Sequence, residues 1–514
     1  MSAFVRSLIV AVIGLLFAVI LGAELGQGSR MVPIMVASAC VGTFLYVCLF
    51  RTVRFEALIL AFLLFGYIVG NRGFAQLSIR PNSPLYLGEL GMVACLFLIT
   101  ARRALTREQL TPRIPLAWAI IVFLLIGGLR LYLDTVVTNS STLVTLAIRD
   151  SAVVYYAFFF FIAYQIGKNE SARKFVERAI LAGFVLLIPG AVIAIWANEL
   201  LTKLTYRGFP LIAYKGDLLT TFLGIGAFYF FFTPSRGALK VFFRACSLAC
   251  LGLMLLGMSR AAFSGFAFAA LLLIVAKRSK FILYQLGVAV VALLAIAFLE
   301  LSNIHFESDF FRNLSDKVTS IVDISGTGHY HGDVGDASAA NNEFRTVWWT
   351  TVFNETMQKG PAFGLGFGYD LTSSFMRAYY PTGGEDTAST RSPHSILFTV
   401  LGRMGLIGLT SFLIILLLLV RMALFAARSV ARGDQPEKNL APWCAVMTLL
   451  VSSMFGVVLE GPMGGILFWS LLGLAVSQSI EPEAPKEAQS DALPRITREP
   501  VLAQTSLIHR RRSA

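Results

Sequence analysis

Charged residues are scarce in this chain. Only 14% of its 514 residues are Asp, Glu, Lys or Arg, whereas about a quarter is typical of soluble globular domains. Hydrophobic residues make up 56% of the chain, and the mean hydropathy is +0.72. This composition excludes an ordinary soluble domain and indicates an integral membrane protein.

Cysteine and metal-ligand clusters are also scarce. The six cysteines, at positions 40, 48, 95, 246, 250 and 444, lie in or near hydrophobic runs, and none has metal-ligand spacing with a histidine. They are interpreted as small apolar packing residues, with no disulfide framework. His329 and His331 stand two residues apart in a Gly-rich segment, and this pair supplies too few ligands for a typical zinc site.

A compact basic domain is absent too, although the net charge is +13. The basic residues recur instead in short loops between hydrophobic runs: Arg51 and Arg54; Arg102, Arg103 and Arg107; Lys168, Arg173 and Lys174; Arg236 and Lys240; Lys277, Arg278 and Lys280; Arg428, Arg432 and Lys438. Basic short loops are retained on the cytoplasmic side of a membrane. The pattern therefore predicts cytoplasmic loops and termini in contact with anionic lipids, with no nucleic-acid partner.

Long hydrophobic runs are abundant. A run of about 17 residues or more can cross roughly 30 Å of hydrocarbon as a helix, and a helix satisfies its own backbone polar groups there. We predict an all-α, polytopic integral membrane protein with about 12–14 transmembrane helices. The approximate spans are 5–23, 32–50, 56–70, 85–101, 115–133, 151–167, 178–197, 217–233, 241–258, 261–276, 281–300, 395–425, 440–459 and 464–479.

These spans divide the chain into four parts. Residues 1–300 hold about eleven predicted transmembrane helices, 301–393 form one large periplasmic loop that is partly helical, 394–480 hold about three further helices, and 481–514 form a disordered cytoplasmic tail. Within the loop, residues 323–342 are rich in Gly, Asp and Ser and are predicted to be mobile. Residues 343–357 predict an amphipathic helix, because apolar residues recur there at helical spacing.

Cations on the predicted outer face are unexpected, because positive charge is normally retained inside. Arg260 opens a hydrophobic span, Arg345 lies in the large loop, and Arg391 precedes His394 by three residues. The planar fork of arginine suits diphosphate oxygens, and histidine can accept a proton near neutral pH. Each residue also has an ordinary explanation: arginines reach towards lipid phosphate or solvent, and histidines cap or pack helices.

Three blocks of sequence resemble the O-antigen ligase and O-antigen polymerase superfamily of bacterial inner membranes. They are Met258-Ser259-Arg260-Ala261-Ala262-Phe263; Arg345 with Trp349 and the glycine-rich stretch 360–368; and Pro393-His394-Ser395 with the Gly-x-x-Gly pattern of 405–409. The chain departs from the family pattern at Ser395, where Asn is frequent, and at Arg403, where many members have Glu. The order of the blocks and the large loop between them make the combination more specific than any one block.

The resemblance implies transfer of a glycan from an undecaprenyl diphosphate carrier to a saccharide or lipid A-core hydroxyl, at the periplasmic face of the bacterial inner membrane. It implies that His394 is the general base and that Arg345 and Arg260 hold the diphosphate. Further candidates for substrate binding are Arg391, Ser259, Trp349 and Glu343. No cofactor is expected, and the lack of an Asp-x-Asp-type cluster in the predicted loop favours metal independence.

Several alternatives stay open at this point. A polymerase and a ligase need the same residues, and the long tail and number of spans favour a polymerase only slightly; a chain-length regulator or a flippase is a further candidate partner. A polytopic transporter or permease without transferase activity is the alternative class, although paired, interrupted helices are not evident. Asp150, after Arg149, is interpreted as part of a helix-terminal ion pair, and Glu460 either lines a cavity or breaks a helix.

Overall fold

The structure is a computed structural model that describes most of the hydrophobic part of the chain. The described residues are 53–78, 86–106, 111–137, 141–206, 208–257, 259–284, 287, 333–379 and 391–480. The predicted spans 5–23 and 32–50, most of the span 281–300, the pair His329 and His331, and the tail from 481 lie outside them.

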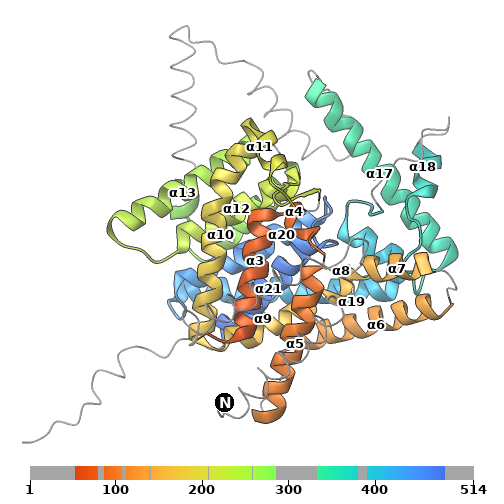
Figure 1. Ribbon diagram of the computed structural model, residues 1–514, viewed down its shortest axis with the longest axis horizontal. Helices are drawn as coiled ribbons and strands as arrows, with labels where there is room; N and C mark the ends of the chain where they lie inside the picture. Colours follow the sequence, from red (N-terminus) through yellow and green to blue (C-terminus); the bar gives the residue numbers. More distant parts are fainter. Residues whose placement is uncertain are drawn as a thin grey trace, which may run out of the picture.

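The described residues are almost entirely helical. The helices are α3 (Phe55–Gly70), α4 (Arg72–Ala75), α5 (Leu87–Thr106), α6 (Pro115–Val137), α7 (Ser141–Asp150), α8 (Ala152–Tyr155), α9 (Phe158–Gly167), α10 (Glu170–Trp196), α11 (Asn198–Lys203), α12 (Gly216–Phe232), α13 (Gly237–Leu256), α14 (Arg260–Val275), α17 (Asp333–Lys359), α18 (Ser373–Tyr379), α19 (Ile396–Arg432), the 3-10 helix η1 (Glu437–Asn439), α20 (Leu440–Ser453) and α21 (Pro462–Ile480). A short antiparallel hairpin joins β1 (Thr205–Tyr206) to β2 (Phe209–Pro210). The helices cluster around α21, while α6 and α19 extend together towards α17 and α18 (Figure 1).

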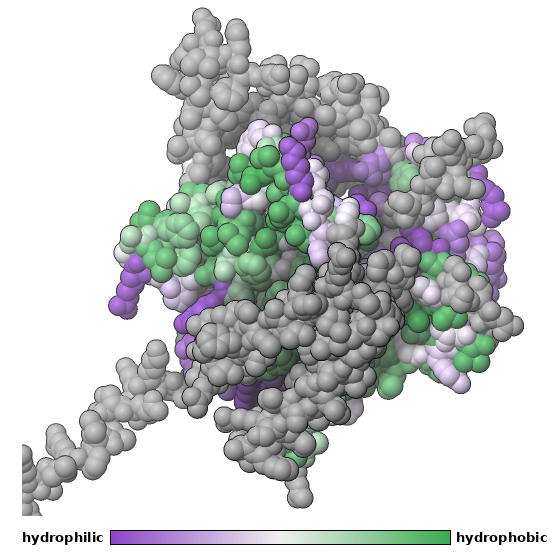
Figure 2. Space-filling view, viewed as in Figure 1, coloured by the Kyte–Doolittle hydropathy of each residue, from purple (hydrophilic) through white to green (hydrophobic). Residues whose placement is uncertain are grey.

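The predicted fold class, an all-α polytopic membrane protein, is confirmed. Six stretches of the described chain are long and apolar enough to cross a membrane: α6, the continuous stretch Leu143–Gly167, α10, α13, α19 and α21. Three shorter apolar helices, α3, α12 and α14, accompany them. Figure 2 shows a broad hydrophobic surface over α10 and α13, where Trp196 and Val241 are exposed as expected for side chains that face lipid.

Small residues allow the central helices to approach one another closely. A Cβ atom on Gly473 of α21 would lie 2.3 Å from the carbonyl oxygen of Phe160 in α9, and one on Gly265 of α14 would lie 2.5 Å from that of Thr448 in α20. Close backbone approach at small residues is a principal source of helix association inside membranes. The first of these contacts holds α21 against α9, and most side chains of α21 are buried.

Most of the basic short loops meet at one end of the helices. Arg102 at the end of α5 pairs with Glu56 at the start of α3, and Arg278 after α14 pairs with Glu437 at 2.7 Å. At the end of α21, Gln478 donates a hydrogen bond to Glu177 of α10 at 2.5 Å. The grouping of these loops on one side agrees with the predicted alternation of the chain.

The predicted amphipathic helix is present but longer than expected. Trp348 and Val352 of α17 are buried against α18, and the Trp348 ring stacks on Phe375 with ring centroids 4.6 Å apart. The prediction of a mobile loop is wrong for residues 333–342, which belong to α17. The stretch holds three alanines, but its other residues have low helix propensity, so local propensity does not account for this part of the helix.

Candidate active site

His394 lies in the short segment that enters α19, against one face of α17. Its ring centroid is 5.7 Å from that of Trp348 and 6.4 Å from that of Phe344. The residue has a positive φ of 57°, which is uncommon for a residue with a Cβ atom, and its backbone N–H donates to Ser392 Oγ at 3.3 Å. The structure therefore places His394 at a sharp turn that contacts with neighbouring residues must stabilise.

Trp349, which follows Trp348 on α17, also contacts the segment that contains His394. Its indole N–H donates to the Pro393 carbonyl oxygen at 2.7 Å, and its ring stacks on Phe398 of α19 with centroids 5.2 Å apart. Trp349 thus contacts the chain on both sides of His394. Its predicted contact with substrate stays a prediction, as does that of Glu343, which is exposed on α17.

Arg345 lies one turn before Trp348 and Trp349 on α17. It is half-buried, and its Nε is buried without a hydrogen-bond partner among the described residues. Burial, together with the charge of Arg260, lowers the pKa of Arg345 to about 10, against the opposing effect of the Asp217 carboxylate. Arg260 is therefore close enough to Arg345 for its charge to lower the pKa of Arg345. Arg345 also retains one donor, Nε, without a partner among the described residues.

Arg260 opens α14 beside the start of the packed part of α17. Its Nη1 donates to the Asn342 side-chain oxygen at 2.6 Å, which brings two of the three family-like blocks together. Ser259 caps α14, because its side chain accepts a hydrogen bond from the Ala262 N–H at 3.4 Å. N-capping is the usual task of serine at such a position, so Ser259 also has a structural role in directing Arg260.

Lys215 and Asp217, at the start of α12, join this site although they were not predicted as site residues. The Lys215 ammonium group lies 3.5 Å from the Asp217 carboxylate and donates to the Val457 carbonyl oxygen at 3.2 Å. Burial lowers the pKa of His394 to about 4; the charges of Arg345 and Lys215 act in the same direction, and Asp217 opposes them. His394 is consequently neutral at pH 7 in the free protein and able to accept a proton.

Arg391 and Arg403 converge on Asp150 at the end of α7. Asp150 Oδ2 lies 3.4 Å from Arg391 Nη2 and 2.8 Å from Arg403 Nη2. Arg391 also donates to the Gly368 carbonyl oxygen at 2.9 Å, while Arg403 is only 2% exposed. Asp150, at the end of α7, thus pairs with two arginines that are distant in the sequence, and the unusual Arg403 is matched by a carboxylate. Binding of diphosphate by Arg391 stays a prediction.

The glycines of the second and third blocks fit against each other. Gly405 interrupts α19 with φ 66°, and Gly364 has φ 74°. The Leu365 N–H donates to the Gly402 carbonyl oxygen at 2.7 Å, and the Leu406 N–H donates to that of Pro361 at 2.8 Å. Only glycine adopts such angles readily at so close an approach. These residues therefore build the bend that carries the His394 end of α19.

We expect Gly405→Ala to lower the thermal stability of the protein. The new Cβ would lie 2.4 Å from the Ala362 carbonyl oxygen, and backbone strain alone costs about 1–3 kcal/mol. The measurement is the unfolding temperature of the purified protein in detergent. Gly252→Ala in α13 is the control, because a Cβ there meets nothing within 4 Å. Equal unfolding temperatures for the two variants would contradict this account of the bend.

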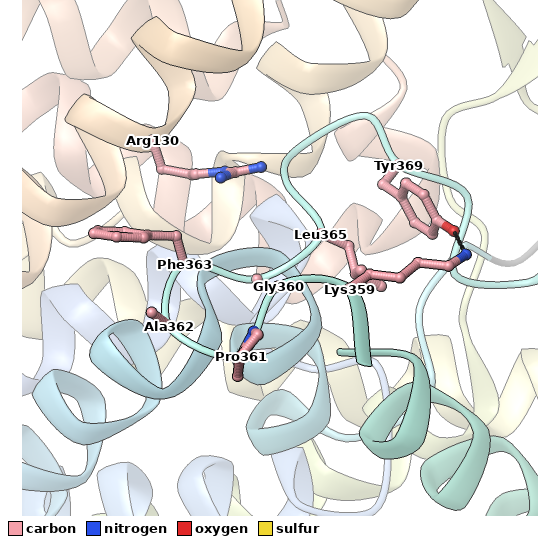
Figure 3. Close-up of a pocket in the computed structure, with 9 residues that line it drawn as sticks. Arg130, Lys359, Gly360, Pro361, Ala362, Phe363, Leu365 and Tyr369 are labelled. Carbon is pink, nitrogen blue, oxygen red and sulfur yellow. Dashed lines mark hydrogen bonds between the residues drawn. The ribbon is translucent and has the colours of Figure 1, made fainter. Parts of the chain in front are cut away.

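A cavity of about 480 Å³ lies beside the glycine-rich segment (Figure 3). Its walls include Arg130 of α6, Phe363, and Lys359 with Tyr369, which are joined by a hydrogen bond of 2.9 Å. Arg130 is paired with Asp134 at 2.9 Å. None of the residues predicted to be catalytic is among those that line this cavity, so the cluster around His394 is a separate site.

The described chain is thus a polytopic helical membrane protein with arginines, a lysine and a neutral histidine gathered at one end. A family model described as O-antigen ligase matches residues 245–413. The match covers about a third of the chain, includes Arg260, Arg345 and His394, and confirms the predicted resemblance. No curated protein matches the chain.

Proposed function

We propose that this protein is a membrane glycosyltransferase that transfers a glycan from undecaprenyl diphosphate to a hydroxyl acceptor. The observation that carries the proposal is the meeting of Arg260, Arg345 and His394, which lie far apart in the sequence. Guanidinium groups suit a diphosphate, and a neutral imidazole suits a hydroxyl proton. The family match supports the class of reaction.

In the proposed reaction, His394 takes the proton of the acceptor hydroxyl as its oxygen attacks the anomeric carbon. The bond from that carbon to the diphosphate oxygen breaks, and the electron pair leaves with the lipid diphosphate. Arg345 and Arg260 stabilise the negative charge that develops on this leaving group. Direct displacement inverts the anomeric centre, and no step requires a metal ion or a cofactor.

The proposed site faces the periplasm, and both termini face the cytoplasm. This orientation is supported by the basic short loops that meet at the other end of the helices, since such loops are retained inside. We further propose that residues 301–393 form one periplasmic loop between the transmembrane helices of 1–300 and those of 394–480. The bacterial inner membrane is the proposed location, because the carrier lipid is anchored there.

The acceptor distinguishes two forms of the proposal. A ligase would transfer the finished glycan to lipid A-core, while a polymerase would transfer it to another carrier-linked saccharide and would act with a chain-length regulator or a flippase. The genes beside this one would separate the two. Transport without transfer is less well supported, because Lys215, Arg260 and His394 gather at one end of the helices rather than along a path through them.

The direct test is transfer by the purified protein. A radiolabelled glycan on undecaprenyl diphosphate, given together with a saccharide acceptor, should yield a labelled product of larger size with the anomeric configuration inverted. We expect the same rate in the presence of EDTA. Loss of the reaction with EDTA and its recovery with Mg²⁺ would contradict metal independence. Release of free glycan with no acceptor product would contradict the transferase assignment.

A further inference from the structure

Glu460 lies in the turn between α20 and α21 and contacts the chain on both sides of His394. The Thr399 hydroxyl, in the first turn of α19, donates to Glu460 Oε1 at 2.8 Å. Ser392, two residues before His394, lowers the pKa of the Glu460 carboxyl, so the two side chains lie close together. One carboxylate from the C-terminal helix pair is therefore bonded to the first turn of α19 and lies near the segment before His394.

This arrangement gives Glu460 a role in positioning. Ser392 Oγ accepts the His394 backbone N–H at 3.3 Å, and Ser392 in turn lies near the Glu460 carboxyl. A residue with a positive φ persists only where its surroundings over-determine that conformation. Part of that constraint comes from the contacts of Glu460, Ser392 and Thr399. The rest comes from the packing of α17 against the His394 segment.

The second carboxylate oxygen of Glu460, Oε2, does not take part in these contacts. Oε2 is buried and has no hydrogen-bond partner among the described residues. Burial raises the pKa of this carboxyl, although its hydrogen bonds and the charges of Lys215 and Arg403 oppose the rise. A buried acceptor that lacks a donor is costly to leave unsatisfied, so a ligand that brings a hydroxyl donor would bind there favourably.

We infer that Glu460 forms a subsite for the acceptor saccharide, with Oε2 accepting a hydrogen bond from a sugar hydroxyl while Oε1 holds the turn of His394. This inference rests on the proposed transferase function. The donor is a poor occupant, because its diphosphate and a carboxylate repel each other, whereas a neutral sugar carries several hydroxyl donors. The charge of Lys215 acts on both His394 and Glu460.

Glu460→Gln tests the subsite with little change of shape. The amide retains one oxygen acceptor, so it cannot serve the turn of His394 and the sugar hydroxyl together. We expect the KM for the acceptor to rise about tenfold or more, kcat to fall, and the Kd for the lipid-linked donor to stay within about twofold of wild type. Ser392→Ala should lower kcat and leave the acceptor KM unchanged, because it loosens His394 without touching the sugar.

Binding of the acceptor saccharide alone, measured by titration of the detergent-solubilised protein, separates this inference from the proposed function. Wild type should bind the sugar about tenfold more tightly than Glu460→Gln, whether or not transfer is observed. Glu437→Gln is the control, because this carboxylate pairs with Arg278 at the other end of the helices. Equal sugar affinity in wild type and Glu460→Gln, with both variants folded by size-exclusion chromatography, would overturn the subsite. Absence of transfer in wild type alone would overturn the proposed function instead.

Discussion

His394→Ala is expected to lower the rate of glycan transfer roughly 10²–10⁴-fold, the usual contribution of a positioned general base. A sugar hydroxyl is a weak nucleophile until its proton is removed, and the described site places a neutral imidazole within the electrostatic influence of Arg345 and Lys215. Binding of the lipid-linked donor should persist, because Arg260 and Arg345 remain. The measurements are single-turnover transfer and donor Kd with the same purified variant.

His394→Gln distinguishes proton transfer from hydrogen bonding. Glutamine can donate and accept hydrogen bonds but cannot take a proton near neutral pH. We expect it to be about as impaired as alanine. If glutamine instead restores most of the rate, His394 only orients the acceptor, and the reaction depends on stabilisation of the leaving diphosphate.

The pH dependence follows from the same site. Burial, with Arg345 and Lys215 nearby, lowers the pKa of His394 to about 4, so the active neutral form is lost only as the pH falls through that value. We expect kcat/KM for the donor to be level down to about pH 5 and to decline below it, since this ratio reports the free enzyme. The diphosphate of a bound donor opposes the nearby cations, so the decline in kcat should occur at higher pH.

The residues that could be predicted from the sequence are those whose chemistry is unusual for their position. Arg260, Arg345 and His394 stood out because cations and histidine are unexpected on the outer side of a membrane protein, and the resemblance to the ligase and polymerase superfamily gave them their predicted roles. Lys215 carries the same signal at the start of α12, but only the structure shows that its charge acts on His394. Asp217 was not predicted either, because only the structure shows that its charge acts on His394.

Long-range packing accounts for what the sequence could not predict. The bend of α19 at Gly405 depends on backbone contacts with Pro361 and Ala362, which hydrophobic periodicity cannot foresee. The pairing of Asp150 with Arg403 likewise joins α7 to α19 across 253 positions of the chain. Several apolar spans, such as 56–70 and 261–276, were predicted to within about one residue, whereas the helix over 333–342 was missed because the composition of that stretch is polar.

Arg345→Ala is expected to lower transfer about 10²–10³-fold, the typical effect of removing one donor that stabilises a developing anion. It should also weaken binding of the lipid diphosphate, because the unused Nε of Arg345 lies in the site. Arg345→Lys should recover only part of the rate, since lysine offers a point charge in place of a fork. The assay compares donor Kd and single-turnover rate for the three proteins.

A pH profile adds a readout that a merely structural arginine would not change. The Arg345 charge lowers the pKa of His394, so its removal should move the acid decline of kcat/KM to higher pH, while Arg345→Lys should leave it near the wild-type position. Arg377→Ala is the control, because Arg377 is an exposed arginine of α18 whose side chain contacts Ser374. Full activity and an unchanged profile in Arg345→Ala would remove Arg345 from the site and leave Arg260 as the main diphosphate ligand.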